Sequence, residues 1–130
     1  MMQISPRRVV HIIVRAREID AKVGTWDRAD DSADADTILE ARRGDATEAE
    51  LRAFIRRLPE DEKAELVAIM WIGRETYDAE EWDEALETAR AEATTPTEKY
   101  LLGVPLLADY LEEGLEKLGV DVTEAEDYFL

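Results

Sequence analysis

Residues 66–72 read Leu-Val-Ala-Ile-Met-Trp-Ile, and Gly73 follows at once. No other segment of this chain is apolar on every side of a helix, so this one should form the buried axis of the fold. Pro59 is suited to begin that helix, and the three acidic residues after it lie in the first turn, where the helix dipole favours negative charge. We therefore expect a buried central helix near residues 60–73.

Apolar residues recur at helical spacing on both sides of this axis. The segments with this pattern are residues 6–24, 47–58, 78–93, 95–102 and 105–118. Asp78 and Glu81 have the spacing of a capping box, and the sequence contains no strand-like alternation of apolar and polar residues. The sequence thus predicts an all-α fold, a compact domain of five or six helices, orthogonal or bundled, that fills residues 1–130 as a single unit.

Two acidic stretches interrupt the helical pattern. Residues 25–45 are rich in Asp, Ala, Ser and Thr, and we expect a long polar linker there. Gly24 is placed to end the helix before this linker, and Thr47, at capping-box spacing from Glu50, is placed to begin the helix after it. Residues 120–130 are predicted to form a short acidic tail with an apolar end.

The formal net charge is −16, and it is spread unevenly. Residues 1–77 hold 16 acidic and 13 basic side chains, a net of −3, whereas residues 78–130 hold 16 acidic and 3 basic, a net of −13. A basic cluster is confined to the first helix and consists of Arg7, Arg8, Arg15, Arg17 and Lys22. This balance argues against nucleic acid as a direct partner and against binding to an anionic membrane surface.

The residue types present also limit the cellular setting. The chain has no cysteine, which excludes disulfides, thiolate zinc sites and a cysteine nucleophile. No apolar run approaches the roughly 20 residues that a membrane span needs, and charges run through the first helix, unlike a signal peptide. We therefore expect a cytoplasmic protein.

Motifs for catalysis or metal binding fail on inspection. His11 is the only histidine, and it shares its helix face with two arginines, with no nucleophile near it in sequence. Residues 30–41 begin with alternating calcium-type ligands, but alanine stands where an EF-hand loop needs its glycine and its final glutamate. The carboxylates near residues 80–87 lack the histidines of di-metal bundles. We expect no catalytic residue, no cofactor and no metal, which argues against an enzyme.

Four residues are candidates for contact with a partner or ligand. Trp26 lies in the polar linker, where it either folds back over the core or anchors a partner. Arg74 directly follows the buried helix. Together with Tyr100 and Tyr110 it could converge on a pocket near the helix break at Gly103–Pro105, because helix interruptions leave backbone groups free for ligands.

Three phrases of the sequence carry a resemblance to a known family. They are residues 65–74 (ELVAIMWIGR), 81–85 (EWDEA) and 100–115 (YLLGVPLLADYLEEGL). In order and spacing they resemble the uncharacterised, mainly proteobacterial family of domains of unknown function numbered 3775, over about residues 48–119. The resemblance implies a small standalone helical protein, and it carries no known activity and no catalytic residues.

The acidic C-terminal region over an apolar core favours a small interaction or regulatory module without catalysis. Its negative surface would attract a basic protein partner. The alternative is a small-molecule-binding or enzymatic helical domain with its pocket near Gly103–Pro105. Homodimer formation is a third hypothesis, because a first helix on a long tether could swap between two copies.

Overall fold

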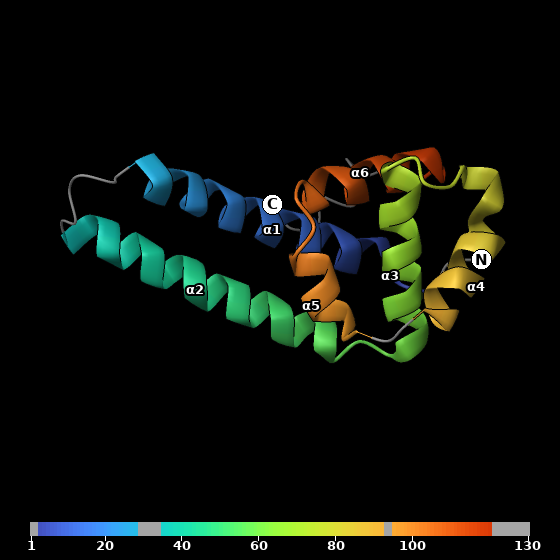
Figure 1. The fold of residues 1–130 in the computed structure, drawn as a ribbon, viewed down its shortest axis with the longest axis horizontal. Helices are drawn as coiled ribbons and strands as arrows, with labels where there is room; N and C mark the ends of the chain where they lie inside the picture. Colours follow the sequence, from blue (N-terminus) through green and yellow to red (C-terminus); the bar gives the residue numbers. More distant parts are fainter. Residues whose placement is uncertain (1–2, 29–34, 93–94, 121–130) are drawn as a thin grey trace.

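A computed structural model describes the chain over residues 3–28, 35–92 and 95–120, with side chains for all of these except 20–28 and 35–45. Six α-helices and one 3₁₀ turn lie in these ranges, and no strand occurs in them. The elements are α1 (Pro6–Arg28), α2 (Ala35–Arg56), α3 (Glu60–Gly73), η1 (Ala79–Glu81), α4 (Trp82–Ala91), α5 (Thr97–Leu102) and α6 (Leu107–Lys117), as Figure 1 shows. The predicted all-α fold is confirmed.

Helix α3 is the buried axis that the sequence predicts. It begins directly after Pro59, and every residue from Ala64 to Gly73 is buried. Helices α4, α5 and α6 all pack against it, and the buried residues of the described elements form one hydrophobic cluster around it. The other helices are therefore amphipathic, because each needs only one apolar side to cover α3 or a neighbour.

Helices α1 and α2 form a long antiparallel hairpin that extends away from the other helices (Figure 1). α1 continues past Gly24 to Arg28, and α2 begins at Ala35 rather than at Thr47. The expected linker over residues 25–45 is thus wrong for all but residues 29–34, which lie outside the described residues. Alanine, glutamate, arginine and leucine are strong helix formers, and a partner helix offsets the roughly 1 kcal/mol that an interior glycine costs.

Beyond α3, the helix boundaries predicted from the sequence lie closer to the observed ones than those predicted for α1 and α2. Asp78 and Glu81 form a capping box, in which the backbone N–H of Asp78 donates to the Glu81 carboxylate at 3.0 Å. Gly103 caps the end of α5. The last helix begins at Leu107 rather than at Pro105, because Leu106 has a left-handed backbone with φ 61° that turns the chain before the helix starts.

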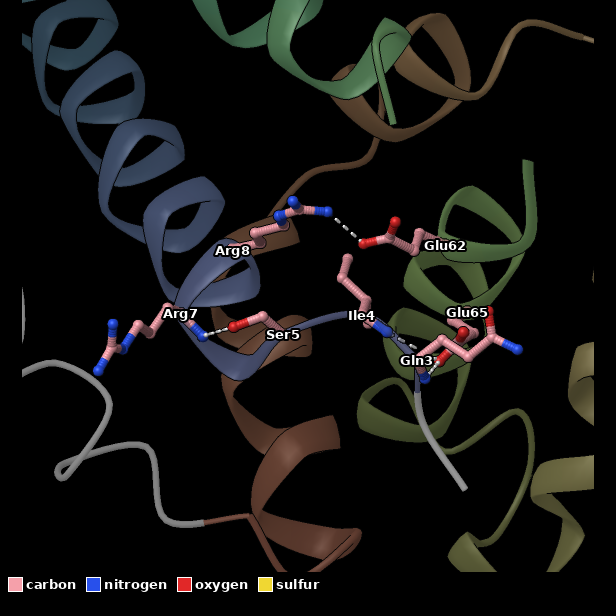
Figure 2. A network of polar contacts seen from close by, with 7 residues as sticks. All are labelled: Gln3, Ile4, Ser5, Arg7, Arg8, Glu62 and Glu65. Carbon is pink, nitrogen blue, oxygen red and sulfur yellow. Dashed lines mark hydrogen bonds and ion pairs between the residues drawn. The ribbon is translucent and has the colours of Figure 1, made fainter. Parts of the chain in front are cut away.

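The segment before α1 is held against α3 by two carboxylates, which Figure 2 shows. Glu65 is only 1% exposed, and its carboxylate accepts hydrogen bonds from the backbone N–H groups of Gln3 at 2.6 Å and Ile4 at 3.4 Å. Nearer the start of α3, Glu62 pairs with Arg8 at 2.7 Å. A buried carboxylate is costly unless it accepts hydrogen bonds. The backbone N–H groups of Gln3 and Ile4 supply them to Glu65, and these bonds together with the Arg8–Glu62 ion pair hold the start of α1 against α3.

Helices α3 and α6 approach so closely that their glycines have no room for a side chain. A Cβ atom on Gly73 would lie 1.7 Å from the backbone oxygen of Tyr110, and one on Gly114 would lie 2.2 Å from that of Ile69. Both neighbours are backbone atoms in helices, so they cannot turn aside as a flexible side chain would. The glycines therefore set the separation of the two helices.

We expect Gly114→Ala to lower the free energy of unfolding by about 3 kcal/mol, because the added methyl group forces α3 and α6 apart. Gly103→Ala is the matched control, since a Cβ there meets nothing closer than 3.5 Å and the stability should change by less than about 1 kcal/mol. Urea unfolding of both variants measures the difference. Equal stability of the two would contradict the close approach.

We expect Glu65→Ala to lower the free energy of unfolding by about 1–3 kcal/mol and to speed hydrogen exchange at the Ile4 amide, which loses its acceptor. Glu65→Gln should have a smaller effect, because its amide oxygen can still accept a hydrogen bond. Exchange at Ile4 that is the same in all three proteins would show that the contact does not hold the segment.

Candidate functional site

A groove of about 430 Å³ lies between α3, α4 and α5. Its floor is apolar and consists of Ala64, Val67 and Trp71 from α3 and Ala89 from α4. Its rim carries five charged side chains (Glu60, Asp61, Lys63, Arg90 and Glu92) and hydroxyl groups, among them that of Tyr100. A concave apolar surface of this size with a few polar groups around it is typical of binding sites.

The aromatic part of the groove is held in place from two sides. The indole Nε1–H of Trp71 donates to the hydroxyl oxygen of Tyr100 at 3.1 Å. On another side the ring of Tyr77 packs against the indole at a centroid distance of 5.8 Å, and the Tyr77 hydroxyl donates to Thr88 of α4 at 3.3 Å. The Trp71 ring is therefore fixed before any ligand arrives, and little side-chain freedom remains to be lost on binding.

The charges at the rim form weak, exchangeable pairs. Arg90 of α4 pairs with Asp61 of α3 at 3.5 Å, and Lys63 pairs with Glu60 at 3.2 Å. Glu92 makes no ion pair with the residues that the structure describes. Pairs as exposed as Arg90–Asp61 contribute about 0–1 kcal/mol, so a charged ligand can replace either partner at low cost.

The structure separates the residues that the sequence suggested as one site. Tyr100 lines the groove, whereas Arg74 is exposed elsewhere and donates from Nε to the Thr76 hydroxyl at 3.1 Å. Tyr110 is half-buried against the core. Trp26 lies in α1, and its side chain is outside the described residues. No residue of the break at 103–105 lines the groove, and of the three candidates whose side chains the structure describes, only Tyr100 lines it.

Sequence reasoning missed the groove because its residues come from three helices. The available signal was the pair of small residues, Ala64 and Ala89, beside the bulky Trp71. Two alanines facing each other across a helix interface leave space that larger side chains would fill. Sequence alone does not show that these positions face each other.

His11 packs as a structural residue in the hairpin. Its ring lies against Phe54 of α2 with a centroid distance of 4.6 Å, beside a hollow that Arg15 and Arg57 also line. Burial lowers the pKa of His11 below its ordinary value of 6.5, the charge of Arg15 lowers it further, and Glu18 opposes both. The imidazole is therefore mainly neutral at pH 7, as expected for a ring packed on an aromatic side chain.

The described part of the chain contains no group of three or more His, Asp or Glu side chains placed to hold a metal ion. None of the helices described is long and apolar enough to cross a lipid bilayer.

We expect the pKa of His11 to lie below 6.5 and to rise on Arg15→Gln, whereas Glu18→Gln should lower it further. The folded pKa is the lower one, so the unfolded chain binds more protons as the pH falls through 6.5. The contribution of His11 to the free energy of unfolding is therefore fully present above pH 6.5, and it is lost as the pH falls from 6.5 towards the pKa of the folded state. An NMR titration of the single histidine measures the shifts, and a pKa unmoved by Arg15→Gln would contradict this environment.

Comparison with known families agrees with the resemblance seen in the sequence. The chain matches DUF3775, a family described as proteins of unknown function, over residues 48–120. That range takes in the end of α2 and all of α3 to α6, and thus every residue that lines the groove. No curated protein and no solved structure matches the chain. Because the matched range is more than half of the 130 residues, the chain belongs to the DUF3775 family of proteins of unknown function.

Proposed function

We propose that this chain is a small protein-interaction module without catalysis, which binds a basic partner. The observation that carries the proposal is an acidic face, by which we mean Glu80 of η1 together with Asp83, Glu84 and Glu87 of α4. All four side chains are exposed, and none forms an ion pair with a residue that the structure describes. Asp83, Glu84 and Glu87 lie on the side of α4 opposite the buried Trp82, Ala85 and Ala89.

The cations of α1 do not balance this face, because several are already paired within the fold. Arg8 pairs with Glu62, and Arg15 pairs with Glu18. Arg17 pairs with Asp109 and Glu112 of α6. An uncompensated negative surface raises the rate of encounter with positively charged proteins and disfavours acidic ones.

A small-molecule-binding domain is the second candidate, and the groove is the observation that favours it. Its volume of about 430 Å³ lies within the range of known ligand pockets, roughly 300–1,000 Å³. The expected pocket near Gly103–Pro105 has less support than this groove between α3, α4 and α5.

We expect the double substitution Glu84→Lys with Glu87→Lys to weaken binding of a lysine-rich peptide by about tenfold at low salt, because it reverses half of the acidic face. Glu113→Lys with Glu116→Lys is the matched control, since it changes net charge equally at the same spacing on α6. Calorimetric titration at low and high salt measures both. Binding that is independent of salt, or weakened equally by the two variants, would contradict the proposal.

A further inference from the structure

We propose that the groove between α3, α4 and α5 receives one bulky apolar side chain from a basic peptide segment of the partner. This inference rests on the proposed function and adds the feature that would select among basic partners. Charge alone attracts many proteins, whereas a shaped apolar pocket discriminates by the side chain that fills it.

The floor of the groove is the first reason. Ala64, Val67 and Trp71 are each 8% exposed and Ala89 is 7% exposed, and all four contribute to the groove surface. The small exposed parts of these four apolar side chains therefore lie together in one groove instead of being scattered over the surface. A leucine or tryptophan side chain that covers them removes apolar surface from water on both partners.

The charges beside the floor are the second reason. Three carboxylates (Glu60, Asp61 and Glu92) and two cations (Lys63 and Arg90) lie on the rim, so the charge around the floor is net negative. Lysine or arginine residues that flank an anchor side chain can take the place of Arg90 on Asp61 and can pair with Glu92. The apolar floor and the carboxylates thus match a segment in which one apolar residue stands between basic residues.

The fixed position of Trp71 is the third reason. Its indole is held by Tyr100 on one side and by Tyr77 on another, so the wall of the pocket exists without the ligand. Anchor side chains bind best in such preformed, well-packed pockets, with polar groups around them that exclude water. A peptide anchor would contact the indole directly, which makes the Trp71 indole N–H a reporter of occupancy.

The test uses three peptides, Lys-Lys-X-Lys-Lys with X as Ala, Leu or Trp, titrated into the full chain labelled with ¹⁵N. We expect the Leu and Trp peptides to bind about tenfold more tightly than the Ala peptide, and to shift the indole N–H resonance of Trp71. Tyr100→Phe removes the acceptor of the Trp71 indole N–H and should therefore change the starting position of that resonance, which assigns it.

Ala89→Leu fills the floor and should abolish the preference for Leu over Ala while leaving the salt-dependent binding. If that variant fails to fold, Asp61→Asn on the exposed rim replaces it. This variant should weaken the binding of all three peptides and keep the preference for Leu and Trp over Ala, and the shift of the Trp71 resonance still shows where the apolar side chain binds. Glu84→Lys with Glu87→Lys should likewise weaken all three and keep the preference.

The outcomes separate the two proposals. Equal, salt-dependent binding of the three peptides overturns the anchor and leaves the interaction module in place. A preference for Leu whose shifts lie away from Trp71 also overturns it. Binding of neutral indole at Trp71 as tight as that of the charged peptides identifies a small-molecule pocket instead. If none of the three peptides shows salt-dependent binding, both proposals are overturned.

Discussion

Helix α3 is buried from Ala64 to Gly73, and the places of its neighbours follow from the way they pack against it. Helix α6 approaches until glycines on the two helices contact the opposite backbone, and α4 lays alanines against it. The carboxylate of Glu65 is buried as well and needs donors, which the residues before α1 supply. One apolar helix with two buried carboxylates, Glu62 and Glu65, therefore orients α6, α4 and the start of α1.

The groove lies where this cover is incomplete. Helix α5 has only 6 residues, which span about 9 Å and cannot follow α3 along its whole length. On the other side, alanines of α4 are too small to fill the space beside Trp71. The site is thus a consequence of how α3 is packed, and its floor belongs to the same hydrophobic cluster that stabilises the fold. If the groove binds a partner as proposed, a substitution on this floor would affect binding and stability together, whereas one on the rim would affect mainly binding.

The features that sequence could predict are the local ones. A helix apolar on all sides, the capping box at Asp78 and the buried face of α4 each depend on residues within a few positions of one another. The helical structure of residues 25–28 and 35–45 was not predictable from apolar spacing, because a helix that packs against a single partner needs only a narrow apolar stripe. The contact of Glu65 with the N-terminal segment and the position of the groove depend on which helices meet, and a single sequence does not contain that information.

The distribution of charge shows the same difference between sequence and fold. In the sequence, the cations of α1 form a basic cluster that could attract acidic molecules. In the structure, Arg17 pairs with carboxylates of α6, and the hydrogen bond that it donates to the Glu112 carboxylate is the main cause that raises the pKa of Arg17. Arg8 is engaged by Glu62 in the same way. Since these cations are paired within the fold and the carboxylates of α4 are not, the surface on the α4 side is more acidic than the order of charges along the chain suggests.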